Sequence, residues 1–149
     1  GFDSPHLQTT ERASGMITSM DHFTIVTDQL ELTRRFYTDL LELRVGQRPD
    51  FPVPGIWLYL KDEPVLHVIE VKEMPVPRRG VLDHMAFSAN DLIRTLGSLQ
   101  KHQVTFRIIR TPGTLTWQVF FYDPNGVEVE LDFAPHEAPP ANWKTLSSR

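Results

Sequence analysis

The chain has 149 residues, 40% of them hydrophobic, which is enough for one globular domain with a sizeable core. Its formal net charge of −4, with scattered lysines and arginines, gives no electrostatic reason to expect nucleic acid or a membrane surface as a partner. The absence of cysteine excludes disulfides, thiolate nucleophiles and cysteine-ligated zinc, and is typical of a cytoplasmic protein. No uncharged apolar run approaches the ~18 residues that span a bilayer.

Both ends of the chain are predicted to lie outside the fold. Residues 1–15 are polar and lack the apolar centre of a signal peptide, so they are interpreted as a disordered tail or a cloning remnant. Residues 134–149 contain several prolines and serines and are predicted to form an irregular C-terminal tail. One domain is therefore expected over residues 16–133.

The first module of this domain is predicted over residues 16–75. Met20–Thr27 alternates between polar and apolar residues and is predicted to be a strand. Asp28 is expected to cap a helix that extends to about Leu41 and places Leu32 on its apolar face. Three strand-like runs follow, separated by turn residues: Arg44–Arg48, Ile56–Leu60 and Val65–Val71.

A linker over residues 73–80 leads to a second module, residues 81–133, with the same order of elements. Val81–Ser88 is predicted to be a strand, and Asn90 or Asp91 is expected to cap a helix to about His102. Three strand-like runs again follow: Val104–Ile109, Thr116–Tyr122 and Val127–Phe133, the last two joined by an Asp-Pro-Asn-Gly turn. The sequence thus predicts an α+β fold built from two tandem β-α-β-β-β modules.

Four potential metal ligands occupy matching positions in the two modules. His22 and His84 each follow an aspartate and open the first strand, whereas His67 and Glu130 lie in the last strand, 45 and 46 residues further on. The period-two pattern of each strand points all four side chains away from the expected helical layer, towards the concave side of the sheet. A pseudo-two-fold relation between the modules could bring them to one point.

Three imidazoles and one carboxylate suit Zn²⁺, Ni²⁺, Fe²⁺, Mn²⁺ and Co²⁺ alike, so a divalent metal is expected without a choice among these ions. Four ligands leave two positions open on an octahedral metal for water or a bidentate substrate. If His67 has only a packing or positioning role, the remaining three form the two-histidine-one-carboxylate set of iron oxygenases.

A further set of strand residues could line a pocket for a small-molecule substrate, although core or interface packing for the aromatic residues and surface salt bridges for the arginines are the more common roles of such residues. These candidates are Arg48, Trp57, Tyr59, Arg107 and Gln118.

The repeated module, the placement of His22 and His84, and the segment Asp123–Leu131 (DPNGVEVEL) resemble the vicinal oxygen chelate superfamily, which includes glyoxalases, bleomycin-resistance proteins and extradiol dioxygenases. Arg34–Leu60 and Trp117–Phe133 are similar to glyoxalase-like proteins of unassigned substrate. The resemblance implies a cupped, barrel-like mixed sheet with helices outside. It also implies a metal held by the four matched ligands, and a homodimer whose sites are built within one chain or across two.

The resemblance implies a metal-dependent lyase or isomerase that acts on a substrate with vicinal oxygens through a metal-stabilised enediolate, with Glu130 as ligand and catalytic base. An extradiol-type Fe²⁺ dioxygenase that uses His22, His84 and Glu130 is a second candidate. A thiol transferase with a cationic pocket is a third, and a metal-free resistance protein that sequesters its ligand is a fourth.

Overall fold

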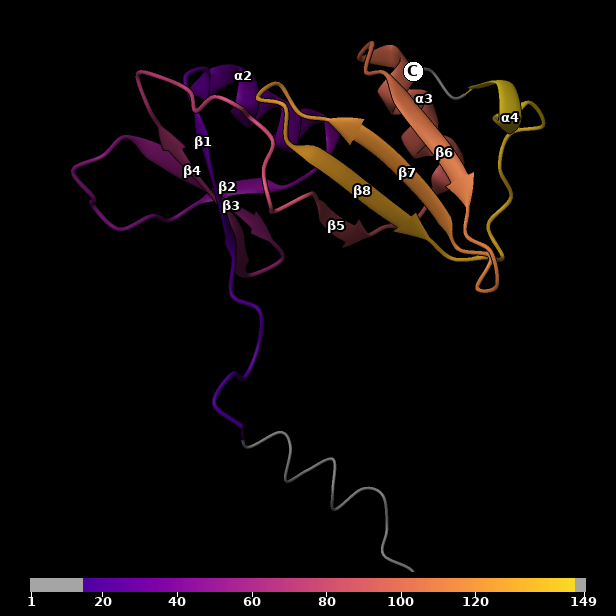
Figure 1. Cartoon of the computed structure of the whole chain (residues 1–149), viewed down its shortest axis with the longest axis horizontal. Helices are drawn as coiled ribbons and strands as arrows, with labels where there is room; N and C mark the ends of the chain where they lie inside the picture. The colour runs from indigo at the N-terminus through magenta and orange to yellow at the C-terminus, as the bar shows by residue number, and fades with distance from the viewer. Residues whose placement is uncertain (1–14, 147–149) are drawn as a thin grey trace, which may run out of the picture.

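The computed structural model describes residues 15–146, and the predicted β-α-β-β-β order occurs in it twice (Figure 1). The first module consists of β1 (Phe23–Thr27), α2 (Leu30–Arg35), the π-helix η1 (Phe36–Leu40), β2 (Arg44–Gly46), β3 (Gly55–Leu60) and β4 (Glu63–Glu70). The second consists of β5 (Met85–Ser88), α3 (Leu92–Lys101), β6 (Phe106–Arg110), β7 (Trp117–Tyr122) and β8 (Glu128–Phe133). A short helix, α4 (Trp143–Leu146), follows.

The two modules form four-stranded sheets of the same topology. The strand orders are β1-β4-β3-β2 and β5-β8-β7-β6. In each sheet the first strand is parallel to the last, and the remaining pairs are antiparallel. The sheets are curved but not hydrogen-bonded to each other, so β1 and β5 remain edge strands within residues 15–146 (Figure 1). The α+β fold of two modules is confirmed, and within one chain the sheet does not close into a barrel.

A single hydrophobic core draws on both modules. In α3 the buried residues Leu92, Leu96 and Leu99 recur at helical spacing and pack on the sheet of the second module. In β4, Leu66 and Val68 are fully buried, which leaves His67 on the opposite face, as the alternation predicts. The core therefore fixes the direction in which the candidate ligands point.

The first helix begins one residue later than predicted, after Gln29 rather than Asp28, and ends at Leu40, beside the predicted end. The Thr27 hydroxyl accepts the Gln29 N–H just before it begins. From Phe36 the helix continues as a π-helix. Its buried residues are Thr33, Tyr37 and Leu40, whereas Leu32, predicted on the apolar face, is 42% exposed.

Buried polar contacts join the two modules. The Tyr37 hydroxyl donates to Asp123 Oδ2 at 2.7 Å. The Thr27 hydroxyl donates to Asn125 Oδ1 at 2.6 Å, and Asn125 Nδ2 donates to the Thr33 hydroxyl at 3.0 Å. Asp123 and Asn125 belong to the predicted Asp-Pro-Asn-Gly turn, in which Asp123 Oδ1 also accepts the Asn125 N–H. The turn before β8 is thus fixed to the helix of the first module.

The segment after β8 packs on the second module. The Glu137 carboxylate accepts the Leu92 N–H at 2.7 Å at the start of α3, and the Glu137 carbonyl accepts the Trp117 indole N–H at 2.9 Å. Trp143 of α4 contacts Trp117 edge to face, with ring centroids 5.0 Å apart. The predicted N-terminal tail, apart from Gly15, lies outside the described residues. No helix within residues 15–146 is long and apolar enough to cross a membrane.

Candidate metal centre

The first module holds two of the predicted ligands in one aromatic stack. The rings of His22 and His67 are parallel within 14°, with centroids 3.7 Å apart. The Trp57 ring also stacks on His67, with centroids 3.9 Å apart, because Trp57 and His67 are direct partners in the β3–β4 register. His22 precedes β1, and its Nδ1 lies 2.6 Å from the Asp21 carboxylate. We call His22 and His67 the first half-site.

His67 presents a nitrogen that fits a metal. Its Nε2 is buried and has no hydrogen-bond partner. Burial, followed by the neighbouring His22, lowers the pKa of His67. The lowered pKa favours the neutral ring, which is the state that a metal requires of a histidine ligand.

The second module holds the other two predicted ligands, which we call the second half-site. His84 Nε2 lies 3.0 Å from Glu130 Oε1, and Gln118 Nε2 donates to Glu130 Oε2 at 3.2 Å. Glu130 is buried, and its burial, followed by the hydrogen bond and charge of Asp132, raises its pKa. One nitrogen and one oxygen ligand atom thus lie side by side, each held by a neighbouring group.

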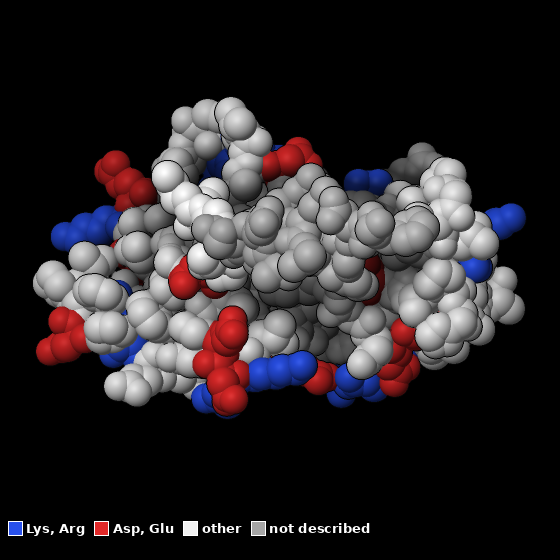
Figure 2. All heavy atoms as spheres, turned by 90° about the horizontal axis from the view of Figure 1, so that it is seen from below, with Lys and Arg blue, Asp and Glu red and all other residues white. Residues whose placement is uncertain are grey.

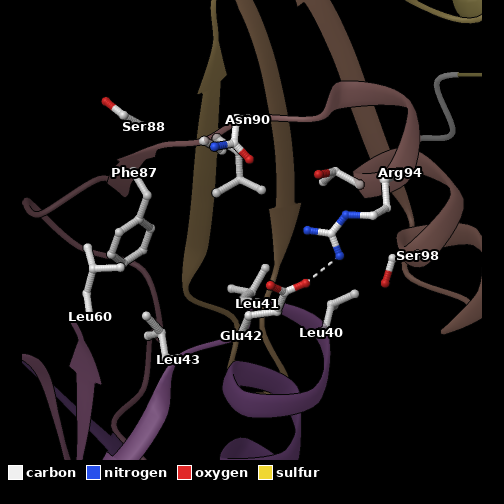
Figure 3. A pocket seen from close by; sticks show the side chains of 13 residues that line it. Leu40, Leu41, Glu42, Leu43, Leu60, Phe87, Ser88, Asn90, Arg94 and Ser98 are labelled. Carbon is white, nitrogen blue, oxygen red and sulfur yellow. Dashed lines mark hydrogen bonds and ion pairs between the residues drawn. The ribbon is translucent and has the colours of Figure 1, made fainter.

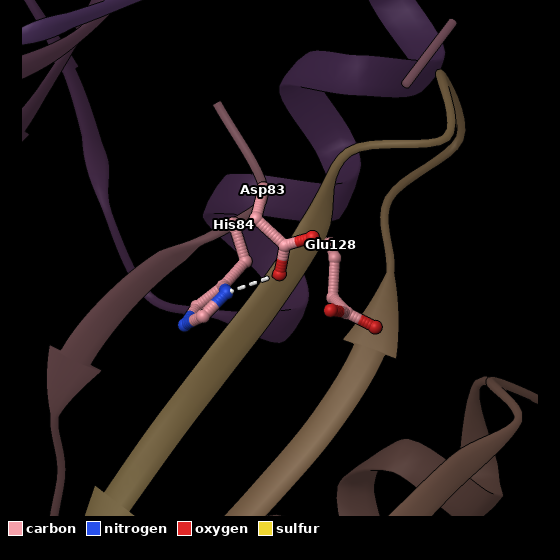
Figure 4. A group of neighbouring side chains, drawn as sticks. All are labelled: Asp83, His84 and Glu128. Atoms are coloured by element: carbon pink, nitrogen blue, oxygen red, sulfur yellow. Dashed lines mark hydrogen bonds and ion pairs between the residues drawn. The ribbon is translucent and has the colours of Figure 1, made fainter. Parts of the chain in front are cut away.

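A second group of potential ligands lies beside His84. Ligand atoms of Asp83, His84 and Glu128 lie within 4.8 Å of one another (Figure 4). However, Arg79 Nη2 lies 3.1 Å from Asp83 Oδ1 and 3.5 Å from Glu128 Oε1. Because a guanidinium already contacts both carboxylates and its positive charge opposes a second cation, this group is better described as a hydrogen-bonded support of His84 than as a cation site.

The structure brings the four predicted ligands together as two pairs, not as one set. Among residues 15–146, the group of Asp83, His84 and Glu128 is the one whose ligand atoms all lie within 4.8 Å of one another. The first half-site belongs to the β1–β4 sheet and the second to the β5–β8 sheet, which stand apart in Figure 1. One chain therefore presents the four candidate ligands as two separate pairs.

The predicted substrate-contacting residues differ in their surroundings. Trp57 and Gln118 contact the half-sites directly, through His67 and Glu130. Arg107 lies over the Phe120 ring, 4.1 Å from its centroid, and Phe120 in turn contacts His84 edge to face. By contrast, Arg48 and Tyr59 are engaged in their own module. The Arg48 guanidinium donates to the Val53 carbonyl, and the Tyr59 hydroxyl donates to the Gln47 carbonyl.

Two hollows lie near these elements. One of about 410 Å³ lies between β1 and the start of β5, and it is lined by His84, Asp83 and Arg79 together with apolar residues of β1. The other, of about 280 Å³, lies on the helical side between η1 and α3, where Arg94 and Glu42 form an ion pair over leucine side chains (Figure 3). It contains none of the predicted site residues. Acidic and basic side chains are interspersed on the face in Figure 2.

The strand and helix patterns do not predict that Asp83 and Arg79 contact the second half-site. For Asp83 the repeated Asp-His dipeptides at positions 21–22 and 83–84 are a signal of such a contact, because the side chains of adjacent residues can form a hydrogen bond just before a strand begins. Arg79 carries no comparable signal, since it lies in a linker of irregular composition.

Comparisons with known proteins agree with this architecture. Structures of similar fold include lactoylglutathione lyase from Agrobacterium tumefaciens, with a TM-score of 0.61 and 18% identity over 81% of this chain and 97% of that chain. The fosfomycin resistance protein FosX from Listeria monocytogenes has a TM-score of 0.64 and 15% identity over 80% and 95%. At these identities the likeness shows the fold alone.

Among curated proteins, the uncharacterized protein YaeR of Escherichia coli is 28% identical over 121 residues, which cover 74% of this chain and 92% of YaeR. The profile of one family matches residues 19–131, which include both half-sites. The chain therefore belongs to the Glyoxalase/Bleomycin resistance protein/Dioxygenase superfamily.

Proposed function

We propose that this protein is a metal-dependent lyase or isomerase for a small substrate with vicinal oxygens, and that two copies of the chain build each metal site. The observation that carries the proposal is the pair of half-sites: His22 with His67, and His84 with Glu130. Each half-site presents two ligand atoms, and neither is complete alone.

The donor set favours four ligands over three. His67 Nε2 is a buried lone pair without a partner, and leaving it unsatisfied costs free energy that a coordinated ion would recover. Coordination by His67 leaves fewer open positions than an oxygenase of the two-histidine-one-carboxylate type uses. When bound, a divalent ion would polarise a substrate carbonyl and lower the pKa of the adjacent C–H group.

Within this site, Glu130 is the proposed base. Its carboxylate is buried, and its raised pKa brings it closer to the range in which a carboxylate exchanges protons efficiently near neutral pH. Gln118 donates to Glu130 Oε2 and so holds one oxygen in place, while Oε1 faces His84. Glu130 is thus the proposed ligand and proton acceptor, and Gln118 its positioning residue.

A homodimer is proposed because it completes the donor set by symmetry. A two-fold axis that places the first half-site of one chain against the second half-site of its partner creates two identical four-ligand sites. The edge strands β1 and β5 leave the open sides of both sheets available for this arrangement. Trp57 beside one half-site and Arg107 above Phe120 beside the other are the proposed walls of the substrate pocket.

Mixing two inactive variants tests whether the sites are shared between chains. His22→Ala and Glu130→Ala each remove one ligand from every site of their own homodimer. After unfolding and refolding together, a heterodimer has one site with both defects and one intact site, so random assembly should restore about one quarter of wild-type metal content. Sites built within one chain would show no restoration, since every chain carries one defect.

Proton exchange tests the reaction class independently. Hydroxyacetone, a small carbonyl compound with vicinal oxygens, is incubated in D₂O with the reconstituted protein, and the loss of its C–H signals is followed by NMR. We expect catalysed exchange with the wild type and with Asp62→Ala, an exposed control in the β3–β4 turn, but not with Glu130→Ala. Exchange that persists in Glu130→Ala would exclude Glu130 as the base.

A further inference from the structure

A chain of hydrogen bonds leads from the linker to the second half-site. Arg79 Nη1 donates to the Tyr122 hydroxyl at 2.6 Å, and Arg79 Nη2 donates to Asp83 Oδ1 at 3.1 Å. The other Asp83 oxygen, Oδ2, lies 2.8 Å from His84 Nδ1. The opposite ring nitrogen, Nε2, lies 3.0 Å from Glu130 Oε1. The two oxygens of Asp83 therefore have separate partners, one from the linker and one from the ligand.

We propose that Arg79 and Asp83 are positioning residues that hold the ring of His84 through Nδ1, so that Nε2, 3.0 Å from Glu130 Oε1, is presented at the metal position beside Glu130. This inference rests on the proposed function, because it assigns these residues a role towards the same metal. A neutral imidazole has one donor and one acceptor nitrogen, and the hydrogen bond made by one nitrogen determines the role of the other.

Arg79 is needed because Asp83 is not held by burial. The Asp83 side chain is 67% exposed, so by itself it would exchange among rotamers in water. Arg79 restrains it, and Arg79 is in turn restrained, since its guanidinium also lies over the Tyr122 ring, 5.4 Å from the centroid. The linker between the modules thereby takes part in the second half-site.

Arg79 also directs His84 to the correct centre. Ligand atoms of Asp83, His84 and Glu128 lie within 4.8 Å of one another and would, without a cation beside them, form a competing group. Arg79 Nη2 lies 3.1 Å from Asp83 Oδ1 and 3.5 Å from Glu128 Oε1, and its positive charge opposes the binding of a metal ion there. Asp83 Oδ2 engages Nδ1 of His84, so the Nε2 side of the ring, beside Glu130, is the side presented to a metal.

The first half-site has the same dipeptide but not the same support. Asp21 lies 2.6 Å from His22 Nδ1, yet its side chain is 87% exposed, and no arginine within residues 15–146 forms an ion pair with it. The two aspartates thus form a natural comparison: the same contact with histidine, with and without a restraining cation. We expect removal of Asp83 to affect metal binding more than removal of Asp21.

The test compares Asp83→Ala with Asp83→Asn, Asp21→Ala and the exposed control Asp62→Ala. The ring tautomer of His84 is measured by ¹⁵N NMR on metal-free protein that also carries Glu130→Ala, which removes the carboxylate at Nε2, at an alkaline pH at which the ring is neutral. Zn²⁺ affinity is measured by competition with a chelator on protein that retains Glu130. Circular dichroism confirms that each variant is folded. Asn retains an acceptor oxygen, so it serves as the conservative replacement.

We expect Asp83→Ala to move the His84 hydrogen to Nε2 and to weaken Zn²⁺ binding by about 10–100-fold, the usual effect of losing such a support. Asp83→Asn should keep the Nδ1–H tautomer, Asp21→Ala should weaken binding less, and Asp62→Ala should change neither measurement. Arg79→Ala should weaken binding in the same direction as Asp83→Ala.

The inference is overturned if Asp83→Ala retains the wild-type tautomer, or if wild type binds Zn²⁺ and Asp83→Ala binds it equally well. A wild type that binds no Zn²⁺ while Asp83→Ala still changes the tautomer would refute the proposed function and leave the role of Asp83 in orienting the ring intact. The two failures are therefore distinguishable.

Discussion

The hydrogen bond between Tyr37 and Asp123 joins the two modules, and its contribution to stability can be measured with one substitution. Tyr37→Phe removes one hydroxyl and leaves the ring volume unchanged. In the wild type this hydroxyl is buried and donates at 2.7 Å to Asp123 Oδ2, in a residue that is itself only 5% exposed. The variant therefore leaves a buried carboxylate oxygen without this donor, while Asp123 Oδ1 keeps its bonds to Asn125 N and Val127 N.

A hydrogen bond to a charged group contributes about 1.5–3 kcal/mol, so we expect Tyr37→Phe to lower the free energy of unfolding by about 2 kcal/mol. For a chain of this size, each kcal/mol shifts the thermal midpoint by about 2–4 °C. Urea unfolding, followed by circular dichroism, measures the change. A loss below about 0.5 kcal/mol, the range of ordinary surface substitutions, would refute the assigned importance of this contact.

The same variant carries a pH signature. Burial, followed by the charge and hydrogen bond of Asp123, raises the pKa of Tyr37 well above its ordinary value. An unfolded tyrosine ionises near pH ~10, so the stabilisation is fully present below that pH and is lost as pH rises towards the folded-state pKa. Wild type should therefore lose more stability than Tyr37→Phe above pH ~10. Parallel curves for the two proteins would contradict this assignment.

Three further substitutions test the fold that supports the site. Asn125→Ala should destabilise by about 2–3 kcal/mol, because it removes two buried hydrogen bonds, one with the Thr27 hydroxyl and one with the Thr33 hydroxyl; Asn142→Ala, on the exposed surface, is the control in urea unfolding. Gly55→Ala should disrupt the β3–β4 pair, because an added Cβ would lie 2.2 Å from the Val68 carbonyl oxygen; a thermal midpoint equal to that of wild type would show that the strands separate easily. Glu137→Ala should lower stability by about 1 kcal/mol, because the Asp91 and Leu92 N–H groups at the start of α3 lose their acceptor; Glu137→Gln, which keeps an acceptor oxygen, should lose less.

Sequence patterns predict much of this fold because strand alternation, helical spacing and helix capping depend on residues that are close together in the chain. The alternation around His67 and the helical spacing of Leu92, Leu96 and Leu99 follow from the geometry of strands and helices. Asp91 caps α3 through its own side chain, as predicted from its position before the apolar run. The π-helix that begins at Phe36 has no such signature, so it does not follow from the sequence.

The sequence proposes the candidate ligands one by one but not their arrangement. Matched spacing singles out His22, His67, His84 and Glu130, because equivalent positions in two copies of one module face the same side. How the two sheets face each other depends on long-range contacts, such as the one between Tyr37 and Asp123, 86 residues apart. No periodic pattern encodes such a contact, so the separation into two half-sites emerges only from the folded chain.

The central claim is that His22, His67, His84 and Glu130 together hold one metal ion. The most direct measurement is the metal content of reconstituted protein, determined by mass spectrometry for wild type and for the alanine variant at each of the four positions, with Asp62→Ala as control. We expect about one divalent ion per chain in wild type and in the control, and loss of that ion in all four variants. Wild-type protein that retains no ion after reconstitution, or a His67→Ala variant that retains it fully, would contradict the four-ligand site.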